Sequence, residues 1–371
     1  MQRRHALSTL ALLCSPHAQG AGEALLGPAS RARHRALDWP ADFGAHPQSR
    51  IEWWYLTGVL QPSDAVGAGG AELGFQVTFF RTRTDVRADH PSAFAARQLV
   101  FAHAAVSDPA ARRLRHDERI ARSGFGVAET GEGDTRIVLR DWTLVRDGPV
   151  THSRYRAQVR SEAAAFGLDL SLRATQPVLL QGDAGWSRKG PRPEQASWYY
   201  SQPQLEASGT LTLDGRSRTV RGRAWFDHEW SDSLLDPDAV GWNWIGMNLA
   251  DGGALTAFAL RRADGSALWA GGSFRAAAGA ASPFAPDEVR FRAGRRWTSP
   301  ATGAVYPVQW AVETPVGAFT VVPRFDAQEI DARATTATVY WEGLSDLIDA
   351  AGRRVGSGYL EMTGYVGRLR L

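Results

Sequence analysis

The chain contains almost no cysteine. Its single cysteine in 371 residues, Cys14, lies near the N-terminus, within a segment that has the features of an export signal. Once that segment is removed, the protein has no disulfide, no thiol nucleophile and no thiolate metal ligand. The sequence therefore excludes cysteine chemistry as the basis of the function.

An excess of charge of one sign is also missing, and lysine is almost absent. The formal net charge of +3 falls to +1 when Arg3 and Arg4 are removed with the signal, and Lys189 is the only lysine. No basic cluster is interleaved with aromatic residues, which argues against a nucleic-acid partner. For Lys189 we favour a solvated loop over a Schiff base or a phosphate contact.

No run of eighteen apolar residues follows the N-terminal segment, so the mature chain is not expected to span a membrane as a helix. The segment itself places Arg3 and Arg4 before the apolar stretch "ALSTLALL" and small residues at positions 18–20. This pattern is typical of a cleaved signal. We predict a signal peptide at 1–20, a linker at 21–37 and a periplasmic or secreted protein, with a buried N-terminal helix as the alternative.

Amphipathic helices longer than two turns are absent, and short aromatic and β-branched segments such as "EWWYLTGVL" and "ELGFQVTFF" take their place. Asp-Gly dipeptides, which tolerate the positive φ angles of tight hairpins, separate several of these segments. The pattern predicts an all-β protein of two tandem antiparallel barrel or sandwich domains, at 38–220 and 221–371.

The stretch "AWFDHEWSDS" carries the densest chemistry. In a strand, Asp227 and Glu229 share one face, while His228 and Trp230 share the other. The paired carboxylates suit an acid kept neutral by its neighbour, or a pair bridged by arginine. A His-Glu-x-x-His metal motif is excluded because position 232 is Asp. A zinc site built from distant histidines is not favoured, and we predict no metal.

Other strands carry polar residues among apolar neighbours, which is the pattern expected of a lined cavity. Well-packed domain interfaces are the alternative explanation. The residues selected on this basis, with the aromatic residues beside them, are Glu52, Trp53, Trp54, Tyr55, Gln76, His103, Tyr199, Tyr200, Trp242 and Trp244.

Several segments in order, among them "HPQSRIEWWYLTGVL", "WFDHEWSDSLLDPDAVGWNWIGMNL" and "GYLEMTGY", resemble the lipocalin-like hydroxyneurosporene synthase family, also called carotenoid 1,2-hydratase-like. The resemblance runs from about His46 to Tyr365. It implies two tandem lipocalin-like domains with an apolar cavity near their junction, and no cofactor. Characterised relatives add water across an isolated double bond of a hydrophobic polyene, by protonation to a tertiary cation and capture by water.

Within this resemblance, His228 and Trp230 match the histidine and tryptophan that the hydratases use, and we expect both to face the cavity. A Tyr-x-Asp pair that supplies the acid in those hydratases is replaced by Leu255 and Ala257. The acid would then be Asp227, Glu229 or Glu52. This departure puts the carotenoid reaction itself in doubt.

Two functions follow from the sequence. One is a hydro-lyase acting on a hydrophobic isoprenoid or lipid, in which exchange of His228 for alanine would abolish turnover. The other is a non-catalytic periplasmic carrier of a hydrophobic ligand; carbohydrate binding on an aromatic surface is a weaker third. The expected partner is a hydrophobic small molecule, with a peripheral membrane contact allowed. No oligomeric state is predicted.

Overall fold

The structure is a computed structural model that describes residues 35–63, 71–232 and 235–369. The predicted signal peptide, and the predicted linker up to residue 34, lie outside the described residues. Within the described part the chain is all-β, and its helical turns are the short 3-10 segments η2 (Ala41–Phe43) and η3 (Val150–His152). No helix in the described residues is long and apolar enough to cross a bilayer.

The first sheet contains thirteen strands in the order β4-β3-β2-β1-β13-β12-β9-β8-β7-β6-β5, and β10 and β11 also pair with β12. Its strands are β1 (Ile51–Pro62), β2 (Leu73–Arg83), β3 (Gln98–Asp108), β4 (Arg113–Arg122), β5 (Ala128–Thr130), β6 (Arg136–Leu139), β7 (Trp142–Asp147), β8 (Arg154–Ser161), β9 (Phe166–Arg173), β10 (Leu179–Leu180), β11 (Trp186–Arg188), β12 (Ala196–Leu213) and β13 (Arg216–Ser231). All of these pairings are antiparallel, and the sheet curls into a nearly closed barrel.

The second sheet contains ten strands in the order β17-β16-β15-β14-β25-β24-β22-β21-β18, with β23 paired to β24. Its strands are β14 (Gly241–Leu249), β15 (Ala254–Arg261), β16 (Ala267–Arg275), β17 (Ala281–Phe284), β18 (Arg290–Ala293), β21 (Trp310–Thr314), β22 (Gly317–Pro323), β23 (Glu329–Ala332), β24 (Thr338–Ile348) and β25 (Arg354–Met362). The strands β19 (Trp297–Thr298) and β20 (Val305–Tyr306) form a separate small hairpin.

The change from one sheet to the other falls between Ser231 and Gly241. The boundary expected at residue 220 lies inside β13, which pairs with β1 on one side and with β12 on the other through to its last residues. A strand with both edges occupied cannot be divided between two domains, so the "DHEW" segment belongs to the first sheet.

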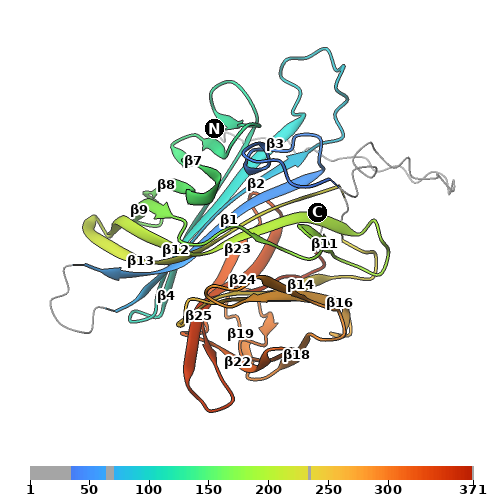
Figure 1. Cartoon of the computed structure of the whole chain (residues 1–371). Coiled ribbons are helices and arrows are strands. Elements are labelled where there is room, and N and C mark those ends of the chain that lie inside the picture. Colours follow the sequence, from blue (N-terminus) through green and yellow to red (C-terminus); the bar gives the residue numbers. More distant parts are fainter. Residues whose placement is uncertain (1–34, 64–70, 233–234, 370–371) are drawn as a thin grey trace, which may run out of the picture.

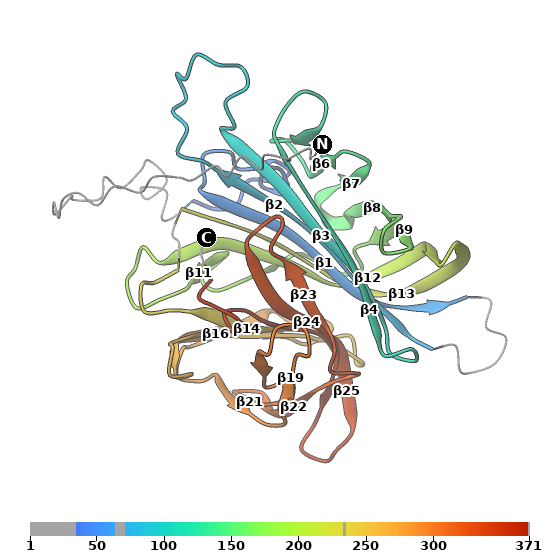
Figure 2. The ribbon, with the colours of Figure 1, turned by 180° about the vertical axis from the view of Figure 1, so that it is seen from behind.

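The two sheets pack face to face, with the orange-to-red second sheet beneath the first in both views (Figures 1 and 2). Because side chains alternate along a strand, the part of the first sheet built by β1 and β13 contacts two environments. Its barrel face carries Trp54 and Phe226, which belong to the core of the first sheet. Its interface face carries Tyr55 and Trp225, which pack against residues of the second sheet such as Trp244.

The interior of the first barrel is filled by protein. The N-terminal strap, defined here as residues 35–50, places Phe43 at 0% exposure within the barrel core. Its aromatic rings meet Tyr200, at centroid distances of 5.1 Å for Trp39 and 5.7 Å for Phe43, and Thr135 donates a 2.7 Å hydrogen bond to the Phe43 carbonyl. A ligand in this fold must therefore sit elsewhere.

A β-bulge in β12 ties the sheets together. The register shifts between Gln202 and Leu205, and Gln204 takes the left-handed backbone conformation, with φ of 59°. Its amide nitrogen Nε2 donates to the carbonyls of Leu249 and Gly253 in the second sheet, at 2.9 and 2.7 Å. The bulge therefore directs the Gln204 side chain toward the second sheet, where it links the two sheets.

Candidate functional site

A cavity of about 350 Å³ lies between the interface face of the first sheet and the second sheet. Its first wall comes from β1, β2, β3, β12 and β13, and its second wall from β14, β15, β24 and β25. Large apolar and aromatic side chains from both walls, including Trp53, Phe101, Trp244, Phe258 and Leu260, make most of the lining. The volume suits a small hydrophobic molecule.

Asp227, on β13, brings a carboxyl group to the first wall with only 3% of its surface exposed. Ser201 and the Trp225 indole donate to its Oδ1 at 2.5 and 2.8 Å, and the Tyr199 hydroxyl contacts Oδ2 at 3.0 Å. These donors favour the carboxylate, but burial outweighs them and raises the pKa of Asp227 to about 7. Asp227 is therefore divided between its neutral and ionised forms near neutral pH.

The second wall carries two further carboxyl groups, Glu342 on β24 and Glu361 on β25, at directly paired positions. The Trp242 indole donates to Oε2 of Glu361 at 2.9 Å, yet burial raises the pKa of Glu361 to about 7. Glu361 is half-buried and keeps surface open to the cavity that it lines. Burial, with the adjacent Glu361 charge, also raises the pKa of Glu342, which accepts a short hydrogen bond from Tyr55.

A cation lies at the edge of the same cavity. The Lys189 ammonium is 3.1 Å from Oε1 of Glu229 and lies over the rings of Tyr199 and Phe258, at 4.7 and 4.3 Å from their centroids. Glu229 also accepts a short hydrogen bond from Ser197. The solvated loop favoured for Lys189 is thus wrong: its side chain is only 23% exposed and lines the cavity.

A row of polar groups crosses the first wall from strand to strand. Asp227 pairs with Tyr55, Tyr55 with Thr78, and Thr78 with His103. His103 is 2% exposed, and burial lowers the pKa of its imidazole to about 3, so the ring is neutral. The cavity therefore has a carboxyl-bearing end at β13 and an end with neutral hydrogen-bonding groups at β3.

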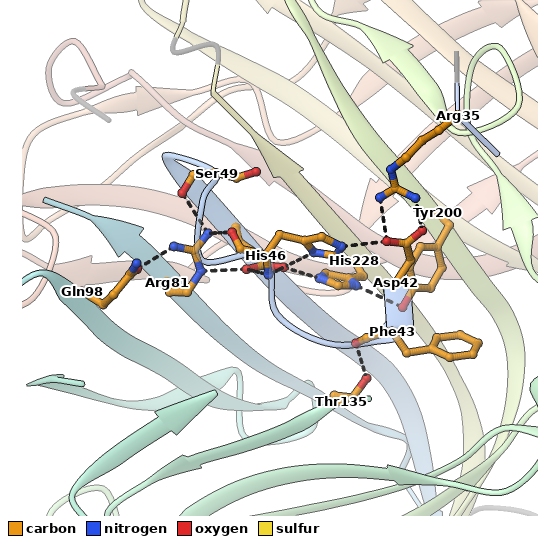
Figure 3. A network of polar contacts seen from close by, with 11 residues as sticks. Arg35, Asp42, Phe43, His46, Ser49, Arg81, Gln98, Thr135, Tyr200 and His228 are labelled. Atoms are coloured by element: carbon orange, nitrogen blue, oxygen red, sulfur yellow. Dashed lines mark hydrogen bonds and ion pairs between the residues drawn. The ribbon is translucent and has the colours of Figure 1, made fainter. Parts of the chain in front are cut away.

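A second polar cluster lies on the opposite, barrel face of the same strands (Figure 3). Glu52 is at its centre: Arg81 Nε donates to its Oε2 at 2.7 Å, and its Oε1 lies 2.7 Å from Nδ1 of His46 and 2.9 Å from Nε2 of His228. Asp42 contacts the remaining His46 nitrogen at 3.0 Å. Glu52 and His228 have 0% side-chain exposure, so the centre of this cluster is closed to solvent.

The charges in this cluster compensate one another. Burial opposes ionisation of Glu52, but hydrogen bonds from His228 and His46 hold its pKa well below the ordinary range. Bonds to Asp42 and Glu52 likewise raise the pKa of His46 despite burial. Burial lowers the pKa of His228 to about 4, so its neutral ring donates to Glu52 and accepts from the Tyr200 hydroxyl at 3.1 Å.

His46, Glu52 and His228 also offer three ligand atoms within 4.8 Å of one another, the geometry of a metal-binding group. Each of those atoms already takes part in a hydrogen bond, and the Arg81 guanidinium bonds to the same carboxylate. A divalent cation would have to displace these bonds beside a fixed positive charge. The arrangement fits an ionic lock between the strap and the barrel better than a metal centre.

The model of the AttH-like family matches residues 30–365, which is almost the whole described chain. The chain belongs to the AttH-like family. This confirms the family resemblance and the lipocalin-type fold predicted from the sequence. No curated protein sequence matches the chain.

Solved structures extend the comparison. A crystal structure from Nitrosomonas europaea that carries the AttH designation is 46% identical, with a TM-score of 0.81 over 89% of this chain and 98% of that one. Kievitone hydratase from Nectria haematococca is 13% identical, with a TM-score of 0.66 over 89% of this chain and 93% of the other. CghA is 12% identical, with a TM-score of 0.51 over 91% and 96%. The last two similarities show the fold alone.

In this AttH-like protein the predicted site residues separate by face. The interface face and the second sheet bring nine of them to the cavity: Trp53, Tyr55, Gln76, His103, Tyr199, Asp227, Glu229, Trp242 and Trp244. His228, Trp230, Trp54 and Tyr200 lie instead in the barrel core or its polar cluster. The expectation that His228 and Trp230 face the cavity is thus wrong, because alternation along β13 gives that face to Asp227 and Glu229. Glu52 touches the cavity wall, but its carboxylate turns to the barrel cluster.

Sequence reasoning missed Glu342, Glu361, Tyr340 and Lys189, all of which line the cavity. Glu342 and Glu361 each stand alone among apolar residues, in "TVYWEGL" and "GYLEM". This is the same signal that selected Glu52 and Gln76, so both glutamates could have been found. The interpretation of Lys189 depended on a loop whose position the sequence does not specify.

Proposed function

We propose that this AttH-like protein is a hydro-lyase that adds water across an isolated double bond of a hydrophobic isoprenoid or lipid. One observation carries the proposal. Asp227 and Glu361 stand on opposite walls of one aromatic-lined cavity, and burial raises the pKa of each to about 7. Near neutral pH such a pair can supply a neutral acid and a carboxylate base at the same time.

Glu361 is assigned as the acid because it lines the cavity and is only partly buried, and the one indole N–H occupies only one of its carboxyl oxygens. Its proton goes to the less substituted alkene carbon, and the π electrons form the new C–H bond. The faces of Trp244 and Phe258, both in the lining, and the carboxylate left on Glu361 stabilise the tertiary cation.

Asp227 is assigned as the base. Its hydrogen bonds with Ser201, Trp225 and Tyr199 fix the orientation of the carboxyl group. It accepts a proton from the water molecule whose oxygen forms the new C–O bond. The next cycle starts when that proton returns to Glu361 through solvent.

The test is incubation with farnesol, whose terminal double bond is isolated, in water enriched in ¹⁸O. Mass spectrometry should show a product that has gained one labelled water. Glu361→Gln and Asp227→Asn should each slow product formation by at least about a hundredfold. The matched control is Glu313→Gln, which should keep the wild-type rate. Glu313 lies on β21, is not among the residues that line the cavity, and forms an ion pair with Arg292.

His228→Ala separates this assignment from the one suggested by the family resemblance. His228 does not line the cavity, so folded enzyme carrying this change should retain turnover. Its stability should fall by about 3 kcal/mol, because Glu52 loses a buried partner. Full loss of turnover in a folded His228→Ala protein would contradict the assignment.

Binding of farnesol without any labelled product would remove the enzyme proposal and leave the carrier predicted from the sequence. Both functions keep the proposed periplasmic or secreted location, which rests on residues 1–20 alone.

A further inference from the structure

The end of the cavity formed by β2, β3 and β24 contains a polar group with no protein partner. Gln76 is 1% exposed and lines the cavity, and its amide nitrogen Nε2 donates to the Thr78 hydroxyl at 2.6 Å. Its amide oxygen Oε1 has no hydrogen-bond partner. An unmatched carbonyl oxygen in a closed site carries a desolvation cost that a ligand donor would relieve.

The neighbouring hydrogen bonds fix what else this end can offer. Thr335 donates to the carboxylate of Glu118, so its oxygen accepts from Nε2 of His103, at 3.0 Å. The neutral His103 ring then has an acceptor at Nδ1, which takes the Tyr340 hydroxyl proton at 2.8 Å. Tyr340, which also lines the cavity, therefore has its proton engaged. Its hydroxyl also interacts with the side chain of Gln76, which places the two groups together, and its oxygen can act toward a ligand only as an acceptor.

Two acceptor oxygens, those of Gln76 and Tyr340, thus lie at one end of a cavity whose remaining lining is largely apolar. A pure hydrocarbon would leave both unmatched. A hydroxyl group can donate its one hydrogen bond to the unpartnered Gln76 oxygen, with the Tyr340 oxygen as the alternative acceptor.

We infer that Gln76 and Tyr340 form a subsite for a ligand hydroxyl group, so that the preferred ligand is a hydroxylated apolar chain and not a hydrocarbon polyene. This deepens the proposed function, on whose cavity it rests.

The sheet register sets the length of that chain. Gln76 pairs with Thr57, and Thr57 pairs with Trp225, two residues from Asp227 along β13. Two strand-to-strand steps and two residues correspond to about 12 Å between Gln76 and Asp227. The hydroxyl and the reacting double bond should lie at the two ends of such a span. Farnesol, with its alcohol at one end and its last double bond at the other, is a suitable probe.

The experiment compares the affinity of farnesol with that of farnesyl methyl ether, which lacks the hydroxyl proton, by quenching of tryptophan fluorescence. Wild-type protein should bind farnesol about tenfold more tightly. Gln76→Met, which keeps the volume and removes the acceptor, should abolish that preference, and Tyr340→Phe should reduce it.

Gln202→Met is the matched control. Gln202 is also 1% exposed with an unpartnered Oε1, but it bonds to Tyr155 and faces the barrel, so this variant should keep the wild-type preference. Equal affinities in the wild type, or an unchanged preference in folded Gln76→Met, would overturn the subsite.

The outcomes separate the two proposals. A preference for farnesol that depends on Gln76, without any hydration product, supports the subsite and rejects the hydro-lyase. If both probes bind with equal affinity and both are hydrated, the hydro-lyase is supported and the subsite is rejected. If neither probe binds, both proposals fall.

Discussion

Asp227 illustrates how burial alone can change the chemistry of a side chain. Three hydrogen-bond partners surround its carboxyl group, enough in a solvated site to keep an aspartate ionised at any physiological pH. Enclosure between two sheets reverses the balance and raises its pKa to about 7. On the other face of the sheet, on the neighbouring strand β1, Glu52 is equally buried, yet hydrogen bonds from His228 and His46 hold its pKa low, and the Arg81 guanidinium bonds to the same carboxylate. The difference lies in whether a cation accompanies the carboxylate.

The raised pKa of Asp227 predicts how stability depends on pH. Between about pH 4, where an unfolded aspartate ionises, and pH 7 the folded protein keeps a proton that the unfolded chain releases. The stability from this group is complete below that window and is lost as the pH rises through 7. Denaturant unfolding should show the wild type losing on the order of 2–4 kcal/mol relative to Asp227→Asn between pH 4 and 8.

Asp264 provides the control for that measurement. Hydrogen bonds from Ser266 lower the pKa of this exposed aspartate, so Asp264→Asn should differ from the wild type by a constant amount above about pH 4. A constant difference for Asp227→Asn as well would contradict the raised pKa.

The candidate site could be predicted only in part. Polar residues in apolar strands led to Gln76 and His103, and the dense stretch "AWFDHEWSDS" led to Asp227; all three line the cavity. Strand periodicity also separated Asp227 and Glu229 correctly from His228 and Trp230. It could not say which face would meet the cavity, because both faces of β13 are buried and the second sheet lies beyond the reach of local pattern.

The strands show the same division between local and long-range information. Asp-Gly dipeptides were predicted to turn the chain back on itself, and Asp214-Gly215 does so between β12 and β13, with positive φ at both residues. The boundary at residue 220 was misplaced because nothing in the local pattern shows that β13 pairs along both edges. The bulge at Gln204 was not predicted either, since glutamine is not a residue that favours the left-handed conformation.

That bulge leads to a prediction about the docking of the sheets. Gln204→Ala removes two hydrogen bonds to the second sheet and leaves the carbonyls of Leu249 and Gly253 without this donor. The free energy of unfolding should fall by about 2–4 kcal/mol. Gln204→Asn, which tolerates the conformation but is too short to reach both carbonyls, should cost less. Unfolding curves that coincide for all three proteins would show that the link contributes nothing.

At the scale of the whole molecule, a pair of aromatic rings lies exposed near the cavity among the described residues. Phe94 and Phe125, on the loops that follow β2 and β4, are 69% and 58% exposed and stack at 5.3 Å. The Arg122 guanidinium lies over both rings. Ile120, on the same strand as Arg122, is 37% exposed and also lines the cavity. Apolar rings beside an arginine suit the headgroup boundary of an anionic bilayer.

We therefore expect the protein to sediment with vesicles of phosphatidylcholine and phosphatidylglycerol. Replacing Phe94 and Phe125 together by serine should weaken binding at least about tenfold, because two phenyl groups no longer enter the bilayer. Val305→Ser, at a 45% exposed site on the small hairpin of the second sheet, should bind like the wild type. Equal sedimentation of the double variant would place the membrane contact elsewhere or exclude it.

The cavity between the two sheets has a carboxyl group on each wall, Asp227 on the first and Glu361 on the second. In alkaline solution Asp227 and Glu361 gain charges of the same sign on surfaces that must stay together, and Lys189 is the one ammonium group at hand. Repulsion between these charges then weakens the contact between the two walls of the cavity. A bound ligand that contacts both walls would therefore stabilise the packing of the two sheets, and the packed sheets would in turn retain the ligand.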